Sequence, residues 1–256
     1  MKLSGKTILI AGASSGIGRA CALELSQHNN HLIICARRQD KLEALAAEIQ
    51  NNGSSAQVAV CDVLNQAQVD TLVQELTDSG KPLDLALLNV GDGPAFNMNT
   101  VSVDDVRNNL DINYQSLVNF LIPLIALMKK QGHGIIAHTN SLAGFIGLPM
   151  QGPYSAAKAA CRILMDSCRI ELEQHGLSFV SLYPGFVATE RVAEDGIPAP
   201  FEISEQQAAR YMIRGIERGK NDVLFPFATA SLIRLARILP KPVLAYLLKK
   251  SVPDEY

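Results

Sequence analysis

Short apolar runs alternate along this chain with longer segments in which apolar residues recur at helical spacing. Near-continuous apolar runs suit parallel strands that are covered on both faces, and strands that alternate with helices imply right-handed crossovers. We therefore expect a single-domain α/β fold with a doubly wound parallel sheet of about seven strands. The runs predicted as strands are residues 7–11, 31–36, 57–61, 83–90, 134–139, 177–182 and 223–225. The segments predicted as helices are residues 16–28, 40–52, 65–79, 103–130, 152–174 and 204–218.

Length and charge narrow the classes of function. A chain of 256 residues holds one sizeable core, and its formal net charge of -2 argues against nucleic acid as a partner, which would require clustered Lys and Arg. The cysteines are odd in number and lack paired spacing, so they indicate buried thiols in a reducing, cytoplasmic compartment and no metal site. They are Cys21, Cys35, Cys61, Cys161 and Cys168.

The start of the chain does not resemble a signal peptide. Its charged Met1-Lys2 is followed by a short apolar run that leads directly into a glycine-rich turn. No stretch reaches the roughly 18 uncharged apolar residues that a membrane-spanning helix needs. We therefore expect a soluble protein.

Three glycines lie where the first predicted strand leads into the first predicted helix. Gly12, Gly16 and Gly18 would permit a tight turn and the close approach of a pyrophosphate to the helix N-terminus, whose free N–H groups favour anions. The spacing G-x-x-x-G-x-G differs from the common G-x-G-x-x-G, and a turn without a ligand is the alternative. The intervening residues Ser14, Ser15 and Ile17 would line the same turn.

The end of the second predicted strand bears on the choice of cofactor. In dinucleotide-binding folds an acidic residue there binds the ribose 2′-hydroxyl, whereas an arginine accommodates a 2′-phosphate. This strand ends in Arg37-Arg38 without an acidic residue, which favours NADP(H), with NAD(H) as a possible second cofactor. The alternatives are a solvated pair of arginines, or recruitment of the nearby Asp40.

Two further strand ends offer contacts to an adenosine. Asp62 and Val63 follow the third predicted strand and would hold the adenine edge through a carboxylate and a backbone amide, although Asp62 is equally suited to cap the next helix. Asn89 and Gly91 end the fourth run, where the small Gly91 would let a ribose approach.

Tyr154 and Lys158 are four residues apart at the start of an Ala-rich helical segment, so both side chains lie on one face, about 6 Å apart along the axis. A nearby ammonium would lower the pKa of the phenol and suit it to general acid–base catalysis. The alternative is an ordinary amphipathic helix. Ser141 lies at the carboxyl end of the fifth run, and Asn113 lies inside a helical segment, where it needs a specific partner.

Taken together, these motifs resemble the short-chain dehydrogenase/reductase family, in its single-domain branch with a Rossmann-like fold. They run in the family order from residue 6 to about residue 220. The set is highly specific, although each motif alone is not. The matching residues are 12–18, Asp62-Val63, Asn89-Val90-Gly91, Asn113, Ser141, Tyr154, Lys158, Pro184-Gly185 and Thr189.

The resemblance implies a role for each residue. Tyr154 would donate or accept the proton of the substrate oxygen, and Ser141 would orient that oxygen. Lys158 would hold the nicotinamide ribose and depress the pKa of Tyr154, while Asn113 would link Lys158 to solvent through its main chain and a water. Pro184, Gly185, Val187 and Thr189 would lie against the nicotinamide. The resemblance also implies a homodimer or homotetramer built on the long helices.

Two positions depart from the family pattern. Ala11 stands where the family often has Thr, which removes one local hydrogen bond. The usual Asn-Asn-Ala-Gly is Leu88-Asn89-Val90-Gly91 here, which replaces a polar side chain near the adenosine. Both changes affect the affinity for the cofactor more than the chemistry, so we expect activity to survive.

The regions around the motifs suggest the substrate. Residues 147–151 are mostly apolar and are expected to line the substrate cleft, and residues 186–204 have the length and breakers of a mobile lid. Neither presents clustered Arg or Lys, so we expect an uncharged or lipophilic carbonyl or alcohol. A dinucleotide-binding sensor without turnover and a sugar-nucleotide epimerase are the competing hypotheses, although an epimerase usually has a longer substrate domain.

The tail is the least typical part of the chain. We place an oxidoreductase domain at residues 1–226 and a helical extension of it at residues 227–256. In residues 227–250 apolar residues recur at helical spacing between Arg and Lys. Such a stretch either lies on a membrane surface or packs against the same protein or another subunit.

Overall fold

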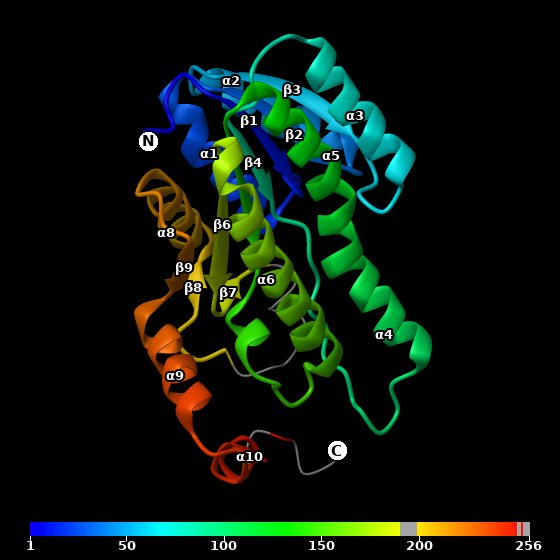
Figure 1. Ribbon diagram of the computed structural model, residues 1–256, viewed down its shortest axis with the longest axis vertical. Helices are drawn as coiled ribbons and strands as arrows, with labels where there is room; N and C mark the ends of the chain where they lie inside the picture. The colour runs from blue at the N-terminus through cyan, green and yellow to red at the C-terminus, as the bar shows by residue number, and fades with distance from the viewer. Residues whose placement is uncertain (190–198, 250–251, 253–256) are drawn as a thin grey trace.

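The computed structural model describes residues 1–189, 199–249 and 252, and it contains one sheet of seven parallel strands in the order β3-β2-β1-β4-β5-β6-β9 (Figure 1). Every strand begins and ends within two residues of its predicted run, which confirms the α/β fold. The order reverses between β1 and β4, and ligands of such sheets bind beyond the carboxyl ends of the strands at this point. The strands are β1 (Thr7–Ala11), β2 (His31–Ala36), β3 (Ser55–Val60), β4 (Leu85–Leu88), β5 (Gly134–Thr139), β6 (Leu177–Pro184) and β9 (Asp222–Phe225).

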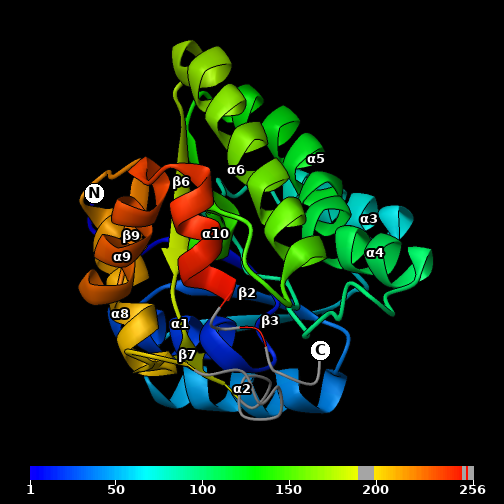
Figure 2. The same cartoon turned by 90° about the horizontal axis from the view of Figure 1, so that it is seen from below.

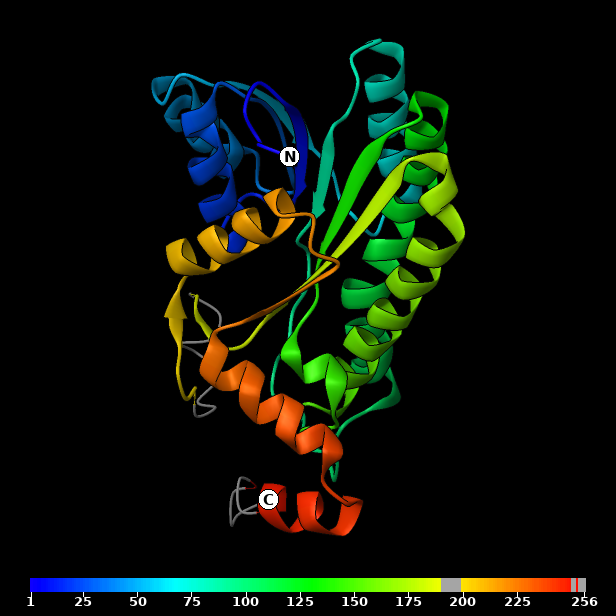
Figure 3. The same ribbon diagram turned by 60° about the vertical axis from the view of Figure 1, so that its left-hand side comes forward.

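Helices cover both faces of the sheet, as Figures 2 and 3 show. Successive strand residues alternate between the faces: Ile8 and Ile10 pack under α1, α2 and α8, whereas Leu9 and Ala11 pack under α3, α5 and α6. Both faces are therefore apolar, as a doubly wound sheet requires. The helices are α1 (Gly16–Leu25), α2 (Gln39–Asn51), α3 (Gln66–Asp78), α4 (Val103–Leu110), α5 (Ser116–Gln131), α6 (Gly152–Leu172) and α8 (Glu205–Glu217).

The helix predicted over residues 103–130 is present as one helical segment, Val103–Gln131, but it is not a regular α-helix throughout. A π-helical turn, Asp111–Gln115, separates α4 from α5. The side chain of Asn113 in this turn is fully buried and donates to the carbonyl of Asp92 (2.7 Å) and that of Asn109 (3.0 Å). The wider turn thus supplies Asn113 with the partners that a regular helix would deny it, and π-turns of this kind are frequent at functional sites.

By length and composition, residues Val103–Gln131 would suffice to cross a membrane, with a mean hydropathy of 1.3 in the most apolar window. The segment is not an unbroken run of apolar residues, because polar side chains such as Gln115 and Asn119 interrupt it. The apolar residues of α5 form part of the core: Phe120, Leu121, Leu124 and Met128 are all buried. A core helix passes the same test, so its composition does not indicate a membrane span.

Beyond β6 the chain forms elements that the sequence indicated only in part. Val187–Ala188 (β7) and Ile203–Ser204 (β8) pair as a separate two-stranded parallel sheet inside the expected lid, and residues 190–198 of that lid lie outside the described residues. The tail forms two helices, α9 (Phe227–Ile238) and α10 (Lys241–Lys249). The division of the chain at residue 226 stays a prediction.

Candidate active site

The glycine-rich turn lies at the carboxyl end of β1, beside the reversal of strand order. Gly12 and Gly16 have φ values of +82° and +59°, which side chains disfavour. A Cβ at Gly18 would collide with the carbonyl of Gly12 and lie 2.9 Å from Asn89 Nδ2. Ser15 precedes α1 without capping it through its side chain, which leaves the first N–H groups available to an anion.

Arg38 is the arginine that contacts this turn. Its guanidinium donates to Ser14 Oγ at 2.9 Å and to Ser15 Oγ at 2.6 Å, which places a positive charge beside the N-terminus of α1. Arg37 is exposed, and the structure shows no comparable contact for it among the described residues. The sequence spacing alone does not distinguish Arg37 from Arg38 as the residue that would contact a 2′-phosphate.

Asp62 does not cap α3, so this alternative was wrong. The cap is Asn65, whose side chain accepts from the backbone N–H of Gln68 at 3.2 Å. The Asp62 carboxylate instead accepts from the N–H of Leu64, which shapes the loop after β3. Val63 is buried, and its carbonyl accepts from Asn119 Nδ2 at 2.9 Å. The loop is thus fixed at the edge where an adenine would lie.

The end of β4 joins the glycine turn to the polar groups of the interior. The Asn89 side chain accepts from Thr139 Oγ1 at 2.8 Å. A Cβ at Gly12 would lie 3.0 Å from Val90 Cγ2, so Val90 packs directly on the turn. A Cβ at Gly91 would lie 2.8 Å from both Asn113 Oδ1 and Lys158 Nζ. Gly91 therefore marks where the crevice at the reversal of strand order meets Asn113 and Lys158.

Ser141, Tyr154 and Lys158 come together at the carboxyl end of β5. Ser141 follows β5 and begins the 3-10 turn Leu142–Phe145, whereas Tyr154 and Lys158 lie in the first turns of α6. The Ser141 hydroxyl accepts from the N–H of Ala143 at 3.1 Å and lies near enough to the Tyr154 phenol to lower its pKa. Lys158 Nζ lies 5.7 Å from the centre of the Tyr154 ring and donates to the Thr139 carbonyl at 3.0 Å.

The pKa of Tyr154 differs from the expectation. Burial raises the pKa of Tyr154 to about 12, while the nearby Ser141 side chain opposes the rise. The lowering of the Tyr154 pKa that was expected from Lys158 is absent in this structure. Lys158 is only 2% exposed, burial lowers its own pKa, and its ammonium is bound to a carbonyl instead of the phenol. In this state Tyr154 is a protonated donor.

Asn113 lies beside Lys158, but its main-chain carbonyl already has a partner. Cys161 Sγ donates to that carbonyl at 3.3 Å. The Asn113 side chain also accepts from the N–H of Asp92 at 3.1 Å, so it holds the segment after Gly91 through both of its amide atoms. Sequence reasoning missed Cys161, although its position one helical turn after Lys158 was a signal.

The remaining predicted cofactor contacts follow β6. Gly185 packs tightly against α9, since a Cβ added at this position would lie 3.1 Å from Thr229 Cγ2. Val187 is buried, and its carbonyl accepts from the N–H of Thr189. A Cβ at Gly16 would lie 3.7 Å from Thr189 Cγ2, so Thr189 lies beside the glycine turn. Pro184 ends β6. The contact with α9 was not predicted, because it depends on how the tail folds back.

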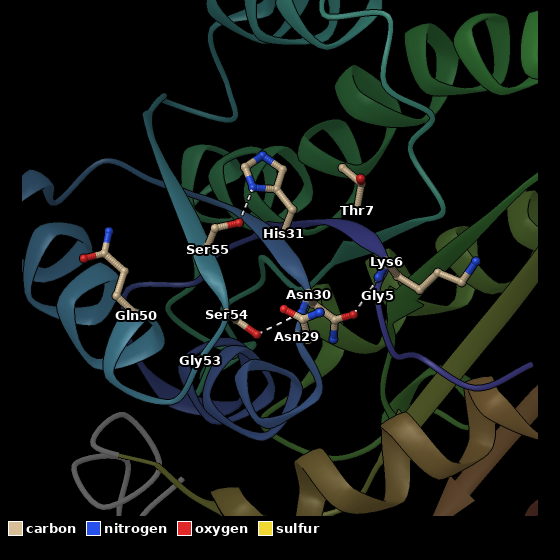
Figure 4. A pocket seen from close by; sticks show the side chains of 10 residues that line it. All are labelled: Gly5, Lys6, Thr7, Asn29, Asn30, His31, Gln50, Gly53, Ser54 and Ser55. Carbon is tan, nitrogen blue, oxygen red and sulfur yellow. Dashed lines mark hydrogen bonds between the residues drawn. The ribbon is translucent and has the colours of Figure 1, made fainter.

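A polar cavity of about 420 Å³ lies at the opposite, amino-terminal ends of β1, β2 and β3 (Figure 4). Its central side chain, Asn30, accepts from the N–H of Lys6 and donates to the carbonyls of Leu3 and Leu25. These bonds fasten the strand ends to the N-terminal segment. The cavity is therefore structural and lies away from the Tyr154 site. No group of three or more potential metal ligands occurs within the ranges that the structure describes.

His138 on β5 is buried close to Lys158, and burial lowers its pKa well below 6.5. A neutral imidazole in the folded state must take up a proton on unfolding at acid pH. We therefore expect stability to fall as the pH drops below about 6.5, by up to about 1.4 kcal/mol per pH unit. His138→Leu is expected to reduce this slope, as measured by urea unfolding at several pH values, with a smaller contribution from His31 remaining.

Neither ring nitrogen of His138 has a hydrogen-bond partner in the described part of the chain. His138→Leu is therefore also expected to be at least as stable as the wild type at pH 8. His28→Leu, at an exposed position, serves as the control. An unchanged slope in the His138 variant would show that this imidazole is not neutral when folded.

The model of the short chain dehydrogenase family matches residues 6–197. The chain belongs to this family. An uncharacterized oxidoreductase of Myxococcus xanthus is 33% identical over 94% of this chain and 96% of its own length. The NADPH-dependent pterin aldehyde reductase of Arabidopsis thaliana is 32% identical over 73% of this chain and 77% of its own. A crystal structure of a short-chain type dehydrogenase/reductase from Mycobacterium marinum covers 88% of this chain and 95% of its own, with 27% identity and a TM-score of 0.77.

The family assignment fixes the coarse function. The protein is an oxidoreductase of the short-chain dehydrogenase family, which uses NAD(P)(H) and acts on small molecules. The glycine turn lies beside the strand-order reversal, where sheets of this kind bind their ligands.

Proposed function

We propose that the protein transfers a hydride between NADP(H) and the carbonyl or alcohol of a small molecule, with Tyr154 as the general acid or base. The observation that carries this proposal is the meeting of Ser141, Tyr154 and Lys158 beside Gly91, at the reversal of strand order. Proton transfer and nucleotide binding would then occur in adjoining space.

The residues at the reversal fit a dinucleotide. A Cβ at Gly12, Gly18 or Gly91 would press on neighbouring protein atoms, so these glycines let the turn and the strand ends pack closely around the start of α1. The Ser15 side chain does not cap α1, so the first N–H groups of the helix can accept an anion. The bound nicotinamide would supply or accept the hydride. The side chains and backbone groups proposed to hold the cofactor are those of Gly12, Ser14, Ser15, Gly16, Ile17, Gly18, Arg37, Arg38, Asp62, Val63, Asn89, Gly91, Tyr154, Lys158, Pro184, Gly185, Val187 and Thr189.

The proton step follows from the environment of Tyr154. With a pKa of about 12 in the free protein, the phenol holds its proton and can donate it to the carbonyl oxygen during reduction. Ser141 would bind and orient that oxygen. The buried Lys158 ammonium would then stabilise the phenolate by electrostatic attraction, which is stronger in the low-dielectric interior than in water. Asn113 is proposed to connect Lys158 with solvent protons.

The contact of Arg38 with the glycine turn supports a preference for NADPH. A guanidinium bound to a 2′-phosphate contributes a charge-assisted interaction that NADH cannot make. Arg38→Ala is expected to lower kcat/KM with NADPH by about 10- to 100-fold and to change that with NADH little. Arg37→Ala is the matched control and is expected to have the smaller effect. A wild type that prefers NADH would contradict the assignment.

The substrate is proposed to be uncharged or lipophilic, since residues 147–151 beside Tyr154 are mostly apolar. Screening ketones, aldehydes and alcohols by nicotinamide absorbance tests the proposal, and pterin aldehydes belong in that panel because a relative is named for them. If no compound turns over while the dinucleotide binds, the competing hypothesis of a sensor without turnover gains support.

We also propose a homodimer or homotetramer assembled through the long helices. α5 and α6 leave large apolar side chains exposed, among them Ile122, Ile163 and Ile170. An assembly that covers these residues would remove apolar surface from water. Light scattering coupled to gel filtration tests this, and a monomer at micromolar concentration would contradict it.

A further inference from the structure

The two C-terminal helices carry an exposed apolar surface. On α9, Phe227, Leu235 and Ile238 lie on one face, with Phe227 79% and Ile238 78% exposed. On α10, the exposed Val243 and Leu247 are four residues apart and so share a face. Together with Leu232 and Tyr246, which are also exposed, these residues form what we call the C-terminal apolar surface.

The rest of the protein covers this surface little. The opposite face of α9 is buried through Thr229, Ala230 and Ile233, so α9 is already packed in the orientation that leaves Phe227 and Ile238 outside. α10 has no buried residue and lies at the extremity of the molecule, beyond α9 (Figure 3).

All the charged side chains of α9 and α10 are basic. Residues 227–250 contain five basic residues and no acidic residue, and the acidic residues nearest to them in the sequence are Asp222, Asp254 and Glu255. Arg234, Lys241 and Lys249 have no ion-pair partner within the parts of the chain that the structure describes. An apolar face flanked by unpaired cations is typical of helices that lie on an anionic bilayer.

We propose that α9 and α10 dock on the surface of an anionic lipid bilayer. The apolar side chains would enter the boundary of the acyl chains, while the neighbouring Arg and Lys contact the headgroups. A second copy of this chain is a poorer occupant, because a twofold contact through α9 and α10 would bring the cations of the two copies together, and neither helix contains an acidic residue.

Docking of this face would bring the active site close to the lipid. α9 packs against the 3-10 turn that follows Ser141, and Thr229 of α9 contacts Gly185. Ser141 and the turn that follows it would thus lie near the bilayer surface. If the proposed function holds, docking on the bilayer indicates the class of substrate. That substrate is a carbonyl compound or alcohol that partitions into membranes.

Flotation of the full-length protein with vesicles tests the docking. The wild type is expected to float with vesicles of phosphatidylcholine and phosphatidylglycerol, and less with phosphatidylcholine alone. Phe227→Ser combined with Ile238→Ser is expected to lower the partition coefficient about 100-fold. Arg234→Ala combined with Lys241→Ala is expected to lower it about 30-fold.

The matched controls lie outside the tail. Ile170→Ser changes an equally exposed isoleucine, and Lys41→Ala combined with Lys129→Ala removes two other lysines; both are expected to float like the wild type. Circular dichroism checks that each variant is folded. A wild type that stays at the bottom of the gradient overturns the proposal, as does equal flotation of all variants. A dimer that the Phe227/Ile238 variant dissociates, without flotation of the wild type, assigns the surface to a second copy.

The docking and the chemistry can fail separately. Tyr154→Phe is expected to float like the wild type, since Tyr154 lies outside the C-terminal apolar surface. If the wild type floats but no carbonyl compound turns over, the proposed function fails and the docking stands. If it reduces carbonyl compounds but does not float, the docking fails alone.

Discussion

Tyr154→Phe is expected to lower kcat for carbonyl reduction by about a thousand-fold and to leave the dissociation constant of NADPH nearly unchanged. The substitution removes one oxygen, and with it the only proton that the phenol can give. The ring would keep its packing against Gly93, where an added Cβ would lie 3.1 Å from the Tyr154 ring. Steady-state kinetics with the best substrate of the panel, together with a fluorescence titration of NADPH, measures both quantities.

Tyr211→Phe is the matched control for this substitution. Tyr211 is 45% exposed and stacks on Phe225, away from Ser141 and Lys158, so its variant is expected to turn over at the rate of the wild type. A Tyr154 variant with more than a tenth of the wild-type kcat would assign the proton to another group.

Gly18→Ala is expected to have the largest effect on the nucleotide site. The added Cβ would overlap the carbonyl of Gly12 and lie 2.9 Å from Asn89 Nδ2, and neither the backbone carbonyl nor a bound amide can move without shifting the turn. We expect a loss of about 3 kcal/mol in the free energy of unfolding, or roughly 6–12 °C in Tm. NADPH is expected to bind no longer at concentrations that saturate the wild type.

Gly147→Ala provides the comparison, because a Cβ there would meet nothing within 4 Å. Its Tm is expected to match that of the wild type in differential scanning calorimetry. If Gly18→Ala binds NADPH with unchanged affinity, the turn around Gly12 does not approach the dinucleotide, and the site must lie elsewhere along the strand ends.

The sheet and the pairing of Tyr154 with Lys158 followed from local sequence patterns, whereas the association of Ser141 with them was implied by the family resemblance. Apolar runs identify buried strands, and a spacing of four on a helix fixes two side chains on one face. Ser141 was placed correctly because parallel strands end at one edge of the sheet.

The sequence patterns do not show which polar groups pair and which groups are buried once the chain is packed. The π-turn at Asn113 depends on carbonyls from the loop after β4, which no helical spacing reveals. Asn65, and not Asp62, caps α3, because the Asp62 carboxylate accepts from the N–H of Leu64 in the preceding turn. Burial raises the pKa of Tyr154, and the expected lowering by Lys158 is absent because the Lys158 ammonium donates its hydrogen bond to the Thr139 carbonyl. Burial and competing acceptors are properties of the packed fold.

The transfer of an isotope label tests the central claim most directly. The purified protein is incubated with the best ketone or aldehyde of the panel and with NADPH deuterated at C4 of the nicotinamide, using each of the two C4 epimers in turn. Mass spectrometry of the alcohol is expected to show one deuterium on the former carbonyl carbon with one epimer, in the wild type but hardly in Tyr154→Phe. An alcohol without deuterium from either epimer, or equal labelling by both proteins at equal rates, would contradict hydride transfer assisted by Tyr154.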